Sequence, residues 1–134
     1  MIRFFKKVNN AILLPDNTAT IFTEGDRMIQ ELMHDLNGAR HHINIEFYIF
    51  EDDAIGNMIK DLLIQKAKEG IKIKVLYDDV GCWNVPQRFF DEMKKSGIKV
   101  FSFLKVRFPF FTNKINYRNH RKIVVIDGRI GYIG

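Results

Sequence analysis

Residues 119–128 read Asn-His-Arg-Lys-Ile-Val-Val-Ile-Asp-Gly, and this segment is the most informative part of the chain. Its four apolar residues, 123–126, predict a buried β-strand. Side chains alternate along a strand, so His120 and Lys122 are predicted to point to the same side. An imidazole can act as a nucleophile or proton carrier, and a lysine ammonium can bind a phosphate oxygen. The segment therefore predicts a rigid element that carries two chemically active side chains.

The pair Asp127-Gly128 follows this strand and precedes a second apolar run. Asp-Gly between two apolar runs is a strong signal for a β-hairpin turn. Two interpretations of Asp127 stay open. It can be a turn residue, or it can support the hydrogen bonds of the site, and one residue can do both.

Hydrophobic periodicity along the rest of the chain alternates between strand and helix patterns. Strands are predicted at residues 18–23, 43–50, 71–77, 98–104, 121–126 and 129–133, and helices around 28–36, 55–63 and 86–93, with a loop over 105–118. Glu46 lies in the middle of an apolar strand, so it either faces solvent or needs a buried partner. The order of elements predicts an α/β fold, a mainly parallel β-sheet flanked by helices. Residues 1–19 are a poorly patterned segment, and residues 20–134 form the predicted domain.

The bulk composition is that of one globular domain of 134 residues. The single cysteine, Cys82, excludes an internal disulfide framework and a multi-cysteine metal site. No stretch reaches the roughly 18 apolar residues of a membrane-spanning helix. The first residues are too short and too charged for a signal peptide.

The net charge of +5 is concentrated in one window, residues 93–126, which contains no acidic residue. Such a field attracts phosphate-bearing partners, although a solvated basic face is the alternative. Aromatic residues beside basic ones in this window suit a membrane interface, stacking on single-stranded nucleic acid, or a plug in the core. The predicted membrane contacts are Arg107, Phe108, Phe110, Phe111 and Lys114.

The pattern His-x-Lys-x4-Asp, followed by Gly134, resembles the signature of the phospholipase D superfamily. The wider string over residues 119–129 resembles bacterial cardiolipin synthases more closely, and so do the segments 43–50 and 70–78. The resemblance extends from about Thr20 to the last residue. It implies a phospholipase D-like half-domain that carries one copy of the motif, truncated at its carboxyl end.

The resemblance also implies roles for the motif residues. His120 attacks phosphorus and forms a phosphohistidine, Lys122 binds the non-bridging phosphate oxygens, and Asp127 completes the catalytic set. The scheme needs no metal and no cofactor. Substrate contacts are expected from the flanking residues Arg118, Asn119 and Arg121.

In this family a second histidine, from a second motif copy, protonates the leaving group. The other histidines, His34, His41 and His42, have no lysine two residues later. A second half-domain of a longer chain, or a homodimer, is therefore expected to complete the site, and the isolated chain is expected to be inactive. Family members usually carry membrane-spanning helices before the catalytic part, so we expect this chain to be a fragment of a cell-membrane enzyme, without a transmembrane segment of its own.

The function implied is a phosphatidyltransferase that moves a phosphatidyl group between phosphatidylglycerol molecules at an anionic membrane surface. A nuclease or lipid hydrolase of the same superfamily is an alternative, because water and alcohol compete for one intermediate. A non-catalytic module that binds anionic lipid is another alternative. The flanking residues favour the transferase, and nucleic acid is not the expected partner.

Overall fold

The fold is seen in a computed structural model that describes residues 16–103 and 119–134. In chain order, its elements are α2 (Gly25–Asn37), β1 (His42–Phe47), α3 (Ala54–Lys68), β2 (Lys72–Asp78), α4 (Gln87–Lys95), β3 (Lys99–Phe103), β4 (Lys122–Ile126) and β5 (Ile130–Ile133). Helices and strands alternate up to β3, which confirms the predicted α/β class.

The five strands form one sheet in the order β3-β2-β1-β4-β5. β1 pairs in parallel with β2, and β2 pairs in parallel with β3, through crossovers that contain α3 and α4. β4 runs antiparallel to β1 and to β5. The sheet therefore contains both parallel and antiparallel pairs. The β4–β5 pair is antiparallel because a short hairpin can join only antiparallel strands.

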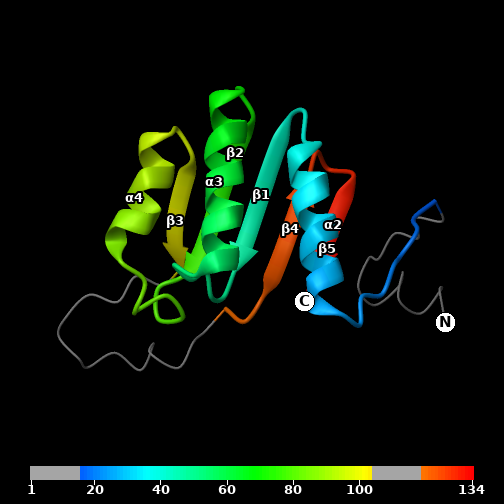
Figure 1. The fold of residues 1–134 in the computed structure, drawn as a ribbon, viewed down its shortest axis with the longest axis horizontal. Coiled ribbons are helices and arrows are strands. Elements are labelled where there is room, and N and C mark those ends of the chain that lie inside the picture. Colours follow the sequence, from blue (N-terminus) through cyan, green and yellow to red (C-terminus); the bar gives the residue numbers. More distant parts are fainter. Residues whose placement is uncertain (1–15, 104–118) are drawn as a thin grey trace, which may run out of the picture.

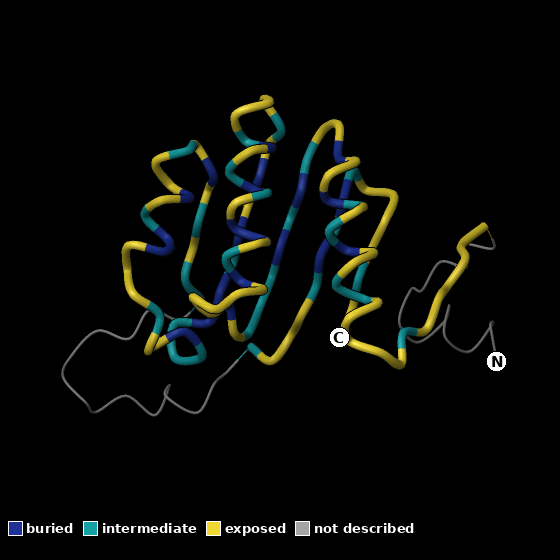
Figure 2. Tube along the Cα trace, viewed as in Figure 1, coloured by how far each residue is buried: buried dark blue, intermediate teal, exposed yellow. Residues whose placement is uncertain are grey.

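The three described helices lie against the same face of the sheet (Figure 1). Alternation along the strands turns one set of apolar side chains toward these helices. Among the strands, the buried residues lie in β1, β2 and β4, and the edge strands β3 and β5 contain none (Figure 2). The helices add their own apolar side chains to the same core. The largest fully buried side chains are Leu36, Ile43, Leu63, Val75, Phe89, Met93 and Val124.

Most predicted elements are present, with ends that move by a few residues. The predicted strand at residues 18–23 is wrong, because residues 17–24 form neither helix nor strand. In this segment Ile21 is 89% exposed, and Phe22 stacks on Tyr132 of β5 with ring centroids 6.2 Å apart. The segment is held by a side-chain contact instead of a strand ladder, because local β-propensity does not supply a pairing partner.

A side chain caps the start of α3. Asp53 has an extended backbone, and its carboxylate accepts a hydrogen bond of 2.7 Å from the amide of Gly56. An added Cβ at Gly56 would lie 1.8 Å from the carbonyl oxygen of Glu51. The close approach of the loop after β1 to the first turn of α3 therefore requires glycine at position 56.

Candidate active site

Two of the motif residues, His120 and Lys122, lie at the end of the sheet where β1 ends and β4 begins. Phe47, the last residue of β1, is paired with Lys122, the first residue of β4. The pairing continues for one residue, because the amide of Tyr48 donates to the carbonyl of Arg121 at 3.0 Å. Carboxyl edges of parallel strands are where α/β proteins commonly place ligands. The sheet thus carries His120 and its neighbours at such an edge.

The spacing predicted that one strand carries both His120 and Lys122. This is wrong, because His120 lies two residues before the start of β4. Its side chain is exposed, and its ring stacks on the ring of Tyr48 with centroids 4.2 Å apart and planes 28° apart. A stacked ring keeps both nitrogens at its edge, outside the stack. An exposed and oriented imidazole has the accessibility that a nucleophile needs.

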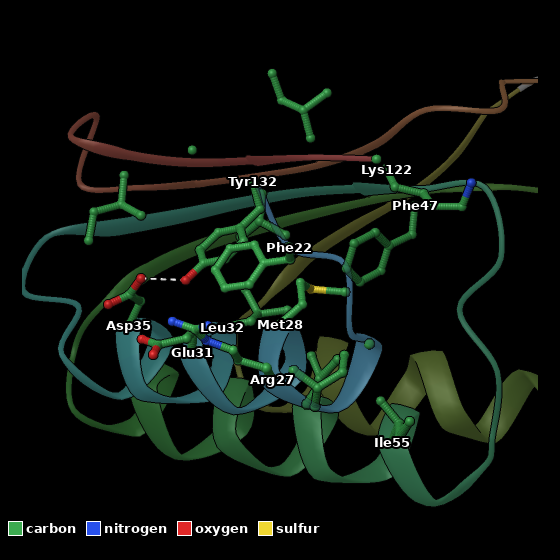
Figure 3. A pocket seen from close by; sticks show the side chains of 18 of the residues that line it. Phe22, Arg27, Met28, Glu31, Leu32, Asp35, Phe47, Ile55, Lys122 and Tyr132 are labelled. Atoms are coloured by element: carbon green, nitrogen blue, oxygen red, sulfur yellow. Dashed lines mark hydrogen bonds between the residues drawn. The ribbon is translucent and has the colours of Figure 1, made fainter. Parts of the chain in front are cut away.

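Lys122 is exposed and contributes to a pocket of about 1170 Å³ between α2 and the β4–β5 part of the sheet. Figure 3 shows Lys122 and Phe47 at one end of this pocket and Asp35 near the other end. Apolar side chains line the space between them, among them Phe22, Met28 and Leu32. Lys122 is thus a charged group at the end of a largely apolar pocket. That His120 and Lys122 point the same way stays a prediction.

Three groups of Asn119 form hydrogen bonds with other residues of the chain. Its backbone amide donates to Asp78 Oδ2 at 3.0 Å, its side-chain amide donates to Glu46, and its side-chain oxygen accepts from the amide of Arg121 at 3.3 Å. Glu46 therefore has a polar partner next to the motif, which the sequence alone could not identify. The contacts of Asn119 fix the segment before β4, and its predicted contact with substrate stays a prediction.

Asp127 lies at the other end of β4, away from His120 and Lys122. Its carboxylate accepts hydrogen bonds of 2.8 Å from three successive backbone amides, those of Arg40, His41 and His42. The hydrogen bond from His42 is the largest cause that lowers the pKa of Asp127 from 3.8 to about 2.

The backbone of Asp127 is also that of a turn. Its φ is +53°, that of Gly128 is +66°, and the amide of Arg129 donates to Ile126 at 3.0 Å. Positive φ at both central residues is what a type I′ hairpin turn requires. Of the two interpretations left open by the sequence, these contacts favour the structural one, and a catalytic role for Asp127 stays a prediction.

The remaining predicted substrate and membrane contacts are Arg121 and a set of residues in the segment before β4. Arg121 is exposed, and its backbone carbonyl pairs with Tyr48. The predicted contacts Arg107, Phe108, Phe110, Phe111, Lys114 and Arg118 lie outside the described residues. Two residues that the sequence did not single out, Tyr48 and Asp78, directly adjoin the site. Tyr48 lies in the predicted strand 43–50 and Asp78 directly follows the predicted strand 71–77, and both belong to segments that resemble the family.

Cys82, the single cysteine of the chain, is buried. Burial raises the pKa of the Cys82 thiol to about 11, so at neutral pH it is not a thiolate nucleophile. Within residues 16–103 and 119–134, no group of three or more His, Cys, Asp or Glu side chains is arranged to hold a metal ion.

In the same part of the chain, no helix has the length and apolar character needed to cross a bilayer.

His120 and Lys122 are both exposed, at the end of a mixed α/β sheet where β1 ends and β4 begins. Residues 32–134 match the family described as "Cardiolipin synthase, PLD-like domain". The chain belongs to this family.

Relatives with similar sequences are also cardiolipin synthases. The cardiolipin synthase of Halalkalibacterium halodurans is 44% identical over 126 residues, which is 94% of this chain. Cardiolipin synthase 2 of Bacillus anthracis is 47% identical over 84% of the chain, and the major cardiolipin synthase ClsA of Bacillus subtilis is 40% identical over 94%. The chain spans 25%, 22% and 26%, about a quarter, of the lengths of these three relatives.

Solved structures show the same fold. NucT from Helicobacter pylori has a TM-score of 0.61 at 24% identity, over 86% of this chain and 70% of that one. The phospholipase D family member Nuc from Salmonella typhimurium has a TM-score of 0.52 at 19% identity, over 78% of this chain and 58% of that one. At these identities the likeness is one of fold.

Proposed function

We propose that this chain supplies one half of the catalytic site of a phosphatidyltransferase of cardiolipin synthesis. The observation that carries the proposal is the exposed His120, held beside the start of β4 and Lys122, in a chain of the cardiolipin synthase family. A positively charged lysine near a nucleophilic imidazole suits an anionic phosphodiester substrate.

In the proposed first step, a ring nitrogen of His120 attacks the phosphorus of phosphatidylglycerol. A nitrogen–phosphorus bond forms, the bond from phosphorus to the headgroup oxygen breaks, and glycerol leaves after its oxygen takes a proton. Lys122 offsets the charge on the non-bridging oxygens while this charge is greatest.

In the second step, a headgroup hydroxyl of another phosphatidylglycerol attacks the same phosphorus and loses its proton. The nitrogen–phosphorus bond breaks, cardiolipin is released and His120 is restored. Splitting one difficult displacement into two easier ones is the gain of covalent catalysis.

The leaving glycerol needs a general acid, and such help contributes about 10²- to 10⁴-fold to a rate. We propose that a second copy of the motif supplies it, from another half-domain or from a second copy of this chain. A demonstrated monomer of this chain alone is accordingly expected to show no family-level turnover. The basic window over residues 93–126 is proposed to hold the site at an anionic membrane surface, in a salt-sensitive way.

The test is to trap the intermediate. A preparation that shows turnover is mixed with phosphatidylglycerol vesicles, quenched rapidly without acid and searched by peptide mass analysis for a histidine that carries a phosphatidyl group on a ring nitrogen. The adduct is expected on His120, and His120→Ala should abolish both adduct and exchange. His34→Ala, which removes an exposed histidine on α2, is the matched control and should change neither.

An adduct that still forms in His120→Ala would contradict the mechanism. The products separate the transferase from the rival hydrolase. The transferase yields cardiolipin and glycerol, whereas a hydrolase yields phosphatidic acid and glycerol. Vesicle binding without turnover in any assembly, unchanged by His120→Ala, would favour the non-catalytic module.

A further inference from the structure

The backbone on both sides of His120 is fixed by long-range hydrogen bonds. Before it, the amide of Asn119 donates to Asp78 Oδ2 at 3.0 Å. After it, the carbonyl of Arg121 accepts from the amide of Tyr48 at 3.0 Å. His120 is therefore held at a defined place on the edge of the sheet, although its side chain is exposed.

Fixing the backbone does not fix the ring. An exposed histidine rotates about its two side-chain torsions, and most of its rotamers would aim the ring nitrogens away from a bound phosphate. The ring of Tyr48 restricts this freedom, because it lies against the face of the His120 ring at a centroid distance of 4.2 Å. Contact through the face leaves the ring edge, which carries both nitrogens, available to substrate.

The ring of Tyr48 has its own support in the turn that follows β2. A Cβ added at Gly81 would lie 2.3 Å from the Tyr48 carbonyl oxygen and 3.0 and 3.1 Å from two of its ring carbons. The backbone of Gly81 is thus packed directly against Tyr48. No other residue type could approach the ring and the carbonyl so closely without displacing one of them.

Asp78 connects the two sides of this arrangement. It is only 2% exposed. Its Oδ1 accepts from the amides of Val80 at 3.0 Å and Gly81 at 2.8 Å, while its Oδ2 accepts from Asn119. One carboxylate therefore fixes both the turn that supports Tyr48 and the residue that precedes His120.

We infer that Tyr48 is a positioning residue for His120, and that Asp78 and Gly81 hold Tyr48 in place. The inference rests on the proposed nucleophilic role of His120. Removing the stack leaves the imidazole present but unaligned, and misplacement by about 1 Å can cost roughly 10²-fold in rate. The loss should fall on kcat, because substrate is bound by other groups and KM should change little.

The experiment compares three variants with the unchanged protein, in a preparation that turns over phosphatidylglycerol. Tyr48→Leu removes the aromatic face, Tyr48→Phe keeps it, and Gly81→Ala pushes against it. Gly38→Ala is the matched glycine control, since its Cβ would meet carbonyl oxygens at an ordinary 3.5 and 3.7 Å. Two readouts are taken: kcat and KM for exchange, and the NMR shifts of the His120 ring protons in protein with isotope-labelled histidine.

Tyr48→Leu is expected to lower kcat by about 10- to 100-fold and to move the His120 ring protons downfield, because the ring current of Tyr48 is lost. Tyr48→Phe should stay close to the unchanged protein in both readouts. Gly81→Ala should change both in the direction of Tyr48→Leu, and Gly38→Ala should change neither.

Two outcomes would overturn the inference. One is a Tyr48→Leu protein that phosphorylates His120 at the unchanged rate, and the other is an equal loss in Tyr48→Leu and Tyr48→Phe. If Tyr48→Leu does not fold, Gly81→Ala and the ring-proton shifts decide the question. Failure of the proposed function would look different, because the adduct would then form in His120→Ala.

Discussion

The two ends of β4 carry parts of one sequence motif but have opposite characters. At the first end His120 and Lys122 are exposed, and their side chains are open to a ligand. At the second end the Asp127 carboxylate accepts hydrogen bonds from three backbone amides of the same chain. Residues that are close in sequence are here divided between a site open to ligand and a structural contact, because a strand separates its ends by about 3.3 Å for each residue.

The difference shows how each end is stabilised. The hairpin end ties β5 and the entry to β1 together through one side chain. The open end has its order supplied by neighbours, chiefly Asp78 and Tyr48. Substitutions at the first end should therefore change the reaction rate, and substitutions at the second end should change the stability of the fold.

Among substitutions that leave His120 in place, the largest effect is expected for Lys122→Ala. The transferring phosphoryl group loses a fixed positive partner, so adduct formation on His120 should slow by about 10²- to 10³-fold, the cost seen when one such donor is removed. Because Lys122 is exposed, thermal unfolding should hardly change. Rapid-quench kinetics and a melting curve check this, and a large drop in stability with an unchanged rate would reverse the assignment of the two ends.

At the second end, Asp127→Asn should lower the unfolding midpoint in denaturant and leave the rate per folded molecule unchanged. Asparagine tolerates the positive φ of the turn, but its amide group turns a donor toward one of the three backbone donors of residues 40–42. Hydrogen exchange at these amides should speed up. A large loss of rate with unchanged stability would instead argue for an electrostatic role of Asp127.

Gly128→Ala tests the turn without touching the carboxylate. With φ at +66° and no atom within 4 Å of an added Cβ, the cost is one of backbone strain alone. We expect a loss of about 1–2 kcal/mol in unfolding free energy. Gly131→Ala in β5, where the nearest atom would be 4.0 Å away, is the control. Equal stabilities for the two variants would show that the turn does not need positive φ at this position.

The smallest effect is a pH dependence confined to acid. The pKa of Asp127 is lowered from 3.8 to about 2 in the folded chain, so the carboxylate stabilises the fold above about pH 4. This contribution is lost as pH falls through about 2. Denaturant melts of the unchanged protein and Asp127→Asn should therefore converge between pH 4 and 2, and a constant difference across this range would contradict the assignment.

Local patterns were sufficient for most of the elements. Alternating and helical periodicities located β1, α3, β2 and α4, and the Asp127-Gly128 signal located the hairpin. The predicted strand at 18–23 failed, because its residues have strand propensity but no partner strand in the described structure, and Phe22 packs on Tyr132 instead. Periodicity also could not show that β4 enters the sheet antiparallel to β1.

For the site, the sequence determined the chemistry through His120 and Lys122, since identity and spacing of reactive groups are local properties. Only the tertiary structure decided what surrounds them. Asp78 and Glu46 bind Asn119 although they lie 41 and 73 positions from it in the sequence. Asp127 binds the amides of residues 40–42, which lie 85 to 87 positions before it. Such contacts arise from strand order and register, which depend on packing of the whole sheet and leave no signal in a short stretch of sequence.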